Sequence, residues 1–168
     1  SWPALSLAVY LKTAIFYLSK HGTTEKVALK IREKLGEENI QVYNLKKQKS
    51  LDINQFDQII IGGSIHAGQV QKRVKDFCTA HSKQLLQKRL GLFLCCMDEK
   101  EADNQFNRAY PETLRKHALV SKVMGGEFLF ERMNFLERAI VKKVAGIKES
   151  VSKINNEEIE QFVEEMRI

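Results

Sequence analysis

The sequence is poor in the residues that divide or cross-link a chain. Only two prolines and three cysteines occur among its 168 residues, and no stretch rich in proline, glycine or serine separates one part from another. Cys78, Cys95 and Cys96 form no CxxC pair and lie within apolar runs, which is typical of buried thiols in a reducing cytoplasm. These absences exclude a disulfide framework and a cysteine-rich metal site, and they favour one domain over residues 12–168.

Long hydrophobic runs are also absent. No stretch reaches the length that a helix needs to span a bilayer. Residues 1–11 are apolar but short, lack a basic leading region and run directly into the first expected strand, so they make a poor signal peptide. We interpret them as a remnant of processing or expression, or as an unusual extension, and we expect a cytoplasmic protein.

Two familiar nucleotide-binding motifs are missing. The chain contains neither GxxxxGK[ST] nor GxGxxG, which disfavours nucleotide hydrolysis and classical dinucleotide binding. It does carry an excess of positive charge, with 27 Lys and Arg against 21 Asp and Glu, a net charge of +6 and a pI near 9.2. This charge favours anionic partners such as phosphates or acidic lipid head groups. Nucleic acid is not expected, because aromatic residues are not interleaved with the lysines as a stacking platform.

Apolar runs of strand length alternate with helical patterns along most of the chain. Strands are expected at 14–18, 40–45, 58–63 and 90–96 and within 122–129, and helices from about residue 24 to 35, over 70–81, 132–148 and 156–168. The segment 97–117 is the least regular, although Pro111 predicts a short helix there. Strands that alternate with helices require right-handed crossovers and a parallel sheet covered on both faces. The sequence therefore predicts an α/β fold, a three-layer α/β/α sandwich with a five-stranded parallel sheet.

A short loop between the first strand and the first helix has the character of a phosphate site. The segment reads Phe16-Tyr17-Leu18-Ser19-Lys20-His21-Gly22-Thr23-Thr24-Glu25. Hydroxyl side chains, a glycine and a helix N-terminus together form an anion cradle from backbone N–H groups and a partial positive charge. An ordinary helix N-cap would explain the same residues.

A second loop, 63–68, follows the third strand. Ligands of an open parallel sheet bind beyond the carboxyl ends of its strands, where the strand order reverses. The loop reads Gly63-Ser64-Ile65-His66-Ala67-Gly68, and its small residues would let the backbone approach a planar ring. Two loops at the correct strand ends favour a ligand site over a simple helix cap.

The first loop resembles the phosphate-loop signature of the flavodoxin family, with His21 at a position where a second hydroxyl residue is usual. The resemblance implies the sheet order 2-1-3-4-5 and non-covalently bound FMN. It places the ring beside the second loop and beside the loop after the fourth strand. The implied cofactor-binding residues are Ser19, Lys20, His21, Gly22, Thr23, Thr24, Ser64, Ile65, His66, Ala67, Gly68, Cys96, Met97 and Asp98.

A narrower resemblance points to one branch of that family. The segment Ile61–Gly68, followed by Phe77 and His81, is similar to the menaquinone-dependent protoporphyrinogen oxidases, as is the segment 125–130 with the helix after it. This resemblance implies an enzyme of haem biosynthesis that takes electrons from a porphyrinogen and passes them to a quinone. Two other interpretations stay open, an electron carrier without a substrate of its own and a binding module that holds no flavin. The oligomeric state stays open too.

Two further features bear on such an enzyme. His66 is the one ionisable side chain that we place beside the ring, either as a proton donor or relay near neutral pH or as a solvent-exposed loop histidine. The helix expected over 132–148 has an apolar side and several basic residues. It should cover a face of the sheet, although its charge also fits peripheral contact with an anionic membrane.

Overall fold

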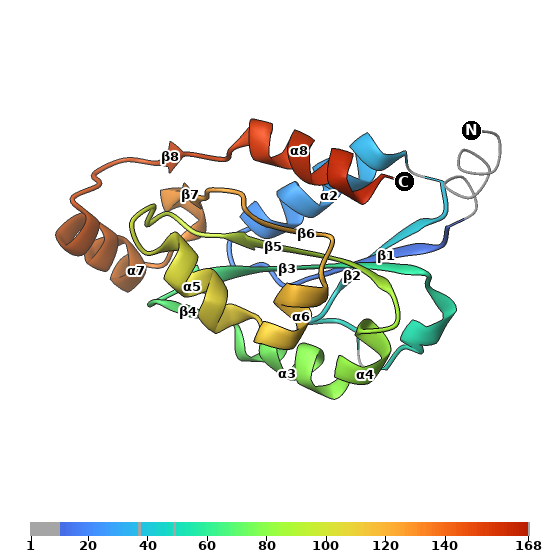
Figure 1. Ribbon diagram of the computed structural model, residues 1–168. Coiled ribbons are helices and arrows are strands. Elements are labelled where there is room, and N and C mark those ends of the chain that lie inside the picture. Colours follow the sequence, from blue (N-terminus) through green and yellow to red (C-terminus); the bar gives the residue numbers. More distant parts are fainter. Residues whose placement is uncertain (1–10, 37, 49, 168) are drawn as a thin grey trace.

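Five parallel strands form the main sheet. The computed structural model describes residues 11–36, 38–48 and 50–167, so the expectation for residues 1–10 lies outside the described residues. The sheet order is β2-β1-β3-β5-β6 (Figure 1), which in chain order is the expected 2-1-3-4-5. The strands are β1 (Thr13–Tyr17), β2 (Ile40–Asn44), β3 (Gln58–His66), β5 (Arg89–Cys95) and β6 (Val120–Val123). The first four strands lie within a few residues of their expected places, whereas β6 begins two residues before the expected segment and ends early in it.

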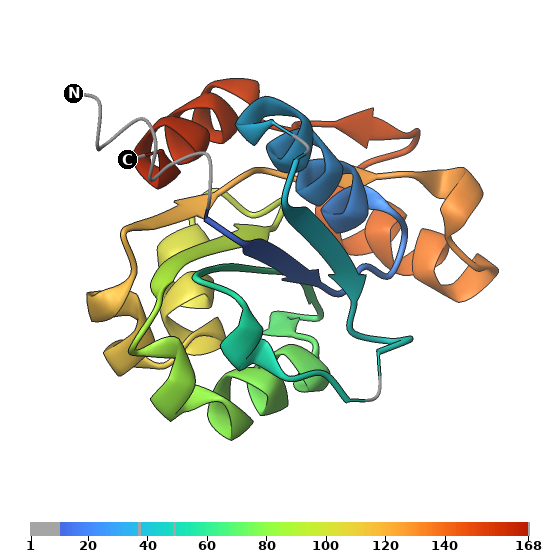
Figure 2. The same cartoon turned by 90° about the vertical axis from the view of Figure 1, so that its right-hand side faces the viewer.

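Side chains of the central strands alternate between two cores. Ile15 of β1 and Phe93 of β5 pack toward α2 (Thr23–Leu35) and α8 (Asn156–Met166). Phe16 and Leu92, their chain neighbours, pack on the opposite face. Figure 2 shows α2 and α8 on one side of the sheet and the other covering helices on the opposite side. Those are α3 (Lys72–Ala80), α4 (Ser82–Leu85), α5 (Ala102–Ala109) and α6 (Glu112–His117). The period-2 alternation of a strand thus produces the predicted three layers.

Local signals set the ends of the two helices on the first face. Helix α2 stops at Gly36, whose φ of 93° suits a residue without a Cβ. Helix α8 begins after Asn155, whose side-chain oxygen accepts a hydrogen bond from the backbone N–H of Glu158. The packing of α8 on the sheet includes an edge-to-face contact between Phe162 and Phe93, with ring centroids 6.0 Å apart.

The second loop is the tip of a hairpin. Strand β3 continues past Gly63 to His66, and β4 (Gln69–Val70) pairs antiparallel with its end. Ala67 and Gly68 form the two-residue turn, with φ of 50° and 76°. Positive φ at both positions matches the twist of the flanking strands. The expectation that Val70 lies on a helix was wrong, because β4 includes Val70 and the helix begins at Lys72.

Two other expectations need correction. Segment 97–117 forms α5 as well as the short helix that Pro111 precedes. The fifth sheet strand, β6, ends at Val123, and the chain beyond it leaves the main sheet. Residues 127–152, called the arm here, contain β7 (Glu127–Phe128), a 3-10 turn (Phe130–Arg132), α7 (Phe135–Ile140), a π-helical turn (Val141–Ala145) and β8 (Val151–Ser152). Strands β7 and β8 pair with each other.

Helix α7 does not cover a face of the sheet as expected. It stands at the far end of the molecule, beside β7 and beyond the strand ends (Figure 1). Phe135 and Val144 are each 81% exposed, and Leu136 and Ile140 are also exposed. The apolar side of the expected helix therefore finds no partner in the two cores.

Candidate functional site

A cavity of about 490 Å³ lies at the carboxyl ends of β1, β3 and β5. Thirteen of the fourteen expected cofactor-binding residues line it, and Gly22, the fourteenth, caps the helix at its edge. The lining comprises Ser19, Lys20, His21, Thr23, Thr24, Ser64, Ile65, His66, Ala67, Gly68, Cys95, Cys96, Met97, Asp98, Gln105, Gly126, Glu127, Phe128, Met133, Glu137, Ile140, Val141 and Val144. The structure thus brings three loops far apart in sequence to one space.

The first loop presents to this cavity the N-terminus of α2, where no side chain forms a capping hydrogen bond. Gly22 is the N-cap of α2 with φ of 98°, and no side chain caps the helix. A Cβ at Gly22 would meet no other atom within 4 Å, so open space lies beside this backbone. The Ser19 hydroxyl accepts a hydrogen bond from the Gly22 N–H at 2.9 Å. The first-turn N–H groups have no intrahelical acceptors, and they remain available to an anion.

Two polar atoms of the cavity wall are buried without a nitrogen or oxygen partner among the described residues. One is Oγ1 of Thr24 in the first loop, which lies beside the Cys95 thiol, and the other is Oε1 of Gln105 in α5. A buried polar atom without a partner costs free energy. Both atoms belong to residues that line the same cavity. A ligand with polar groups at both ends would satisfy them.

Charged side chains surround the first loop. Oε2 of Glu137 lies 3.0 Å from both Nζ of Lys20 and Nε2 of His21. A backbone hydrogen bond from Asn134 and the hydrogen bond with Lys20 lower the pKa of Glu137 to about 2. This carboxylate therefore stays ionised near neutral pH, and the arm is tied to the loop by charge.

A second carboxylate also meets this loop. The Glu127 side chain, 4% exposed, accepts hydrogen bonds from the Thr23 hydroxyl at 3.0 Å and from Nζ of Lys26 at 2.9 Å. Burial opposes its ionisation, but hydrogen bonds from Lys26, Ser152 and Thr23 outweigh burial and hold the pKa of Glu127 below its usual value. The arm thus contacts the loop through two negatively charged side chains.

A glutamine side chain joins the two loops. Nε2 of Gln71 donates to the Leu18 carbonyl oxygen at 3.2 Å and to Oγ of Ser64 at 2.8 Å, and its Oε1 accepts from the Ser64 N–H at 3.0 Å. Because Ser64 accepts from Gln71, its own hydroxyl proton is free to donate to Nε2 of His66, 2.9 Å away. The donors and acceptors of both loops are therefore fixed relative to each other.

The environment of His66 differs from expectation. Burial, followed by the charges of Lys20 and His21, lowers the pKa of His66 to about 4. The imidazole is then neutral at pH 7, so it does not serve as a proton donor that titrates near neutrality. It is also not the only ionisable side chain here, because Lys20, His21 and Glu137 line the same cavity. What His66 offers a ligand is a neutral ring with fixed hydrogen bonding.

The end of β5 supplies two thiols. Cys95 and Cys96 both line the cavity and are buried. Burial raises the pKa of Cys95 to about 12 and that of Cys96 to about 11. Cys78, packed among the helices on the opposite face, has its pKa raised to about 12 for the same reason. All three thiols are therefore protonated at neutral pH. This agrees with the interpretation of the cysteines as small buried hydrophobic residues.

The arm contributes a wall that sequence reasoning missed. Met133, Ile140, Val141 and Val144 line the cavity with apolar side chains. Gln105, Glu127 and Glu137 were also not expected there. All of these residues reach the loops only because of the tertiary fold. The one sequence signal for this wall was the mixture of basic and apolar residues over 132–148.

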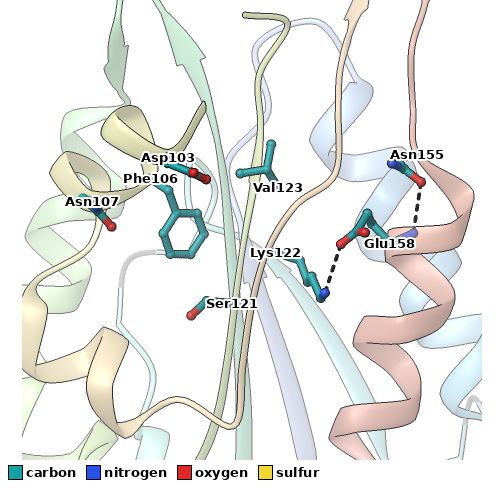
Figure 3. A pocket seen from close by; sticks show the side chains of 8 residues that line it. All are labelled: Asp103, Phe106, Asn107, Ser121, Lys122, Val123, Asn155 and Glu158. Carbon is teal, nitrogen blue, oxygen red and sulfur yellow. Dashed lines mark hydrogen bonds and ion pairs between the residues drawn. The ribbon is translucent and has the colours of Figure 1, made fainter. Parts of the chain in front are cut away.

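A second cavity of about 580 Å³ lies along the open edge of β6, between α5 and α8. Figure 3 shows Asp103, Phe106 and Asn107 on one side of β6 and Asn155 and Glu158 on the other. Nζ of Lys122 is 3.1 Å from Oε2 of Glu158, and a lysine on an edge strand discourages pairing with another chain. This cavity lies away from the strand ends that form the first.

Comparison with known proteins agrees with this geometry. A family model described as a flavodoxin domain matches residues 14–155. The chain belongs to the flavodoxin family. A curated flavodoxin from Haemophilus influenzae is 31% identical over 91 residues, which are 53% of this chain and 52% of that protein. The chain thus spans about half the length of the curated relative that it matches.

Solved structures of flavodoxins share the fold. A short-chain flavodoxin associated with a PDU bacterial microcompartment is 15% identical with a TM-score of 0.59, covering 93% of this chain and 96% of that one. The two-electron reduced flavodoxin of Megasphaera elsdenii is 19% identical with a TM-score of 0.51, covering 68% and 82%. At these identities the likeness concerns the fold alone. None of the helices in the described ranges has the length and hydropathy required to cross a membrane.

The residues of this flavodoxin-family chain fit the family's cofactor. In flavodoxin, FMN binds where the strand order reverses, between the first and third strands. Here that point holds the uncapped N-terminus of α2 and the buried Thr24 hydroxyl. Gln105 offers an acceptor without a partner at the cavity wall. A phosphate ester at the first position and a polar ring edge at the second would complete both sets of hydrogen bonds.

Proposed function

We propose that this chain is an FMN-dependent oxidoreductase that oxidises a reduced organic substrate of the porphyrinogen type and passes the electrons to a quinone. The coarser conclusion, a flavodoxin-like flavoprotein of electron transfer, follows from the family match. The observation that carries the finer proposal is the apolar wall that Met133, Ile140 and Val144 add to the cavity. A carrier needs only an accessible ring edge, whereas a large, mainly apolar organic substrate needs apolar surface beside the ring.

In this proposal the chain's own residues bind and orient while the cofactor supplies hydride and electron chemistry. The N-terminus of α2 and the hydroxyls of Ser19 and Thr24 would hold the phosphate. Gln71 keeps the two loops in register through Leu18 and Ser64. The wall of the arm would exclude water from the reacting face.

The experiment compares two residues of α7. Purified protein with FMN is assayed for oxidation of protoporphyrinogen with a menaquinone analogue. Ile140→Gln, which alters a residue of the cavity wall, should raise KM for the porphyrinogen about tenfold. Leu136→Gln makes the same kind of change on the same helix, outside the cavity lining, and should leave KM unchanged. Equal effects of the two variants, or no turnover at all, would refute the proposal.

The electron-carrier function is the second candidate, and the match to a curated flavodoxin favours it. A carrier would exchange electrons rapidly with a flavodoxin reductase and show no turnover on porphyrinogen or quinone. The positive net charge of +6 argues against it, because carriers of this kind are usually acidic to suit basic partners. A colourless protein that does not take up added FMN would instead support the binding module without flavin.

A quinone acceptor would reside in the membrane, so the proposal includes contact of this chain with the cytoplasmic face of an anionic membrane. The residues of α7 and of the π-helical turn that do not line the cavity include Phe135 and Leu136, both exposed, together with Arg138, Lys142 and Lys143. Arg138 and Lys143 form no ion pair with any residue in the described ranges. Exposed apolar residues among basic ones bind the surface of anionic bilayers. Sedimentation with phosphatidylglycerol vesicles should exceed that with phosphatidylcholine vesicles, and Phe135→Ala should reduce it. Equal sedimentation with both lipids would contradict this contact.

A further inference from the structure

Glu137 of the arm contacts the two basic side chains of the first loop. Oε2 of Glu137 is 3.0 Å from Nζ of Lys20 and 3.0 Å from Nε2 of His21. Its other oxygen, Oε1, accepts a hydrogen bond from the backbone N–H of Asn134 at 3.1 Å, as part of a capping box at the start of α7. The carboxylate is therefore held at both oxygens, with one directed at the loop.

The loop groups that bind this carboxylate are the ones that would neutralise a phosphate. Lys20 and His21 are the basic side chains among residues 19–24, and both line the cavity with Glu137. The Glu137 side chain is 23% exposed and that of His21 is 15% exposed, so solvent screens their interaction only in part. A phosphate dianion at the N-terminus of α2 would lie close to this carboxylate and repel it.

We propose that Glu137 determines how strongly the site distinguishes a flavin with a phosphate from one without it. Glu137 acts as the counter-ion of the loop and must withdraw when a phosphate takes its place. The affinity for FMN is therefore reduced by the cost of breaking the ion pair with Lys20 and the contact with His21, whereas the affinity for riboflavin is not. Withdrawal also breaks the contact that ties the start of α7 to the first loop, so the amides of this segment exchange faster when a phosphate is bound.

Binding measurements with two flavins test this selectivity. Dissociation constants for FMN and riboflavin are measured on the apoprotein by flavin fluorescence for the wild type and for Glu137→Gln. The glutamine keeps a side-chain oxygen for the capping box, so α7 should still form. We expect FMN to bind about five- to tenfold more tightly to the variant, with riboflavin unchanged.

The matched control is Glu149→Gln. Glu149 lies on the same arm, is exposed and has no hydrogen bond or ion pair with the described part of the chain. This variant changes net charge by the same amount and should leave both constants unchanged. An unchanged ratio of the FMN and riboflavin constants in Glu137→Gln, or an equal change in Glu149→Gln, would overturn the proposal. Neither dissociation constant depends on porphyrinogen turnover. A failure of this proposal can therefore be distinguished from a failure of the proposal that a porphyrinogen is the substrate.

Hydrogen exchange supplies a second readout. Amides of 135–144 in the wild type should exchange faster with FMN bound than with riboflavin bound, since only FMN displaces Glu137. In Glu137→Gln the two flavins should give the same exchange in this segment. Slower exchange with FMN than with riboflavin in the wild type would show that the phosphate fastens α7, and the proposal would be wrong.

Discussion

The sheet and the arm both contain many apolar residues but use them differently. In the sheet, Ile15 and Phe16 are adjacent in β1 and each is buried in a different core. In the arm, Phe135 and Val144 are largely exposed, and the contacts with the first loop include ion pairs and hydrogen bonds to Glu127 and Glu137. The sheet is held by packing, whereas the arm meets the first loop through charged side chains. Conditions that leave the sheet intact can therefore move the arm.

The largest expected effect is a difference in the free energy of unfolding between two phenylalanine variants. Phe162→Ala removes a fully buried ring that packs against Phe93, and it should lower the free energy of unfolding by about 3–5 kcal/mol. Phe135→Ala removes a ring that is 81% exposed, and it should change that energy by less than about 0.5 kcal/mol. Urea denaturation measures both. Similar losses would show that the arm is part of the packed structure.

The next effect is the pH dependence of stability that His66, at the end of β3, should cause. Because His66 has a pKa of about 4 in the folded protein and about 6.5 when unfolded, the unfolded state binds its proton first as pH falls. His66 thus contributes stability above pH 6.5, and this contribution, up to about 3 kcal/mol, is lost as pH falls from 6.5 to 4. In His66→Gln, denaturation should show a shallower loss over that range. Identical pH profiles for the two proteins would contradict the prediction.

The smallest effect tests the hairpin turn at the end of β3. Ala67 has a φ of 50°, a conformation that costs most residues free energy and costs glycine little. Ala67→Gly should raise the free energy of unfolding by about 0.5–1 kcal/mol. Ala118→Gly, at a position with φ of −58°, should lower it instead, because there the alanine is unstrained. Thermal melting of both variants tests the opposite signs.

Sequence reasoning located the sheet well because buried parallel strands leave a plain signal. Ile59, Ile60 and Ile61 form a continuous apolar run, and such a run is typical of a strand covered on both faces. The first loop was likewise recognisable, since hydroxyl residues and Gly22 precede a helical pattern. These signals are local, so the order of residues suffices to read them.

The arm could not be predicted in the same way. An amphipathic pattern over 132–148 shows that one side of the helix is apolar, but the pattern does not identify what that side faces. The hydrogen bond between Thr23 and Glu127 joins residues 104 positions apart, and that separation leaves no periodic signal. Gln105 is buried and polar, but in the sequence it looks like an ordinary surface residue. The candidate site was thus predicted on its loop side and missed on its arm side.

The burial of the three thiols has a consequence for the chemical durability of the protein. Oxidants attack the thiolate form of cysteine, and with pKa values of about 11 to 12 for Cys78, Cys95 and Cys96 fewer than about one in a thousand of these groups is a thiolate at pH 7. An oxidant that enters the cavity therefore meets almost no thiolate, even though Cys95 and Cys96 form part of its wall. The cysteines of the cavity wall are therefore poor targets for oxidation.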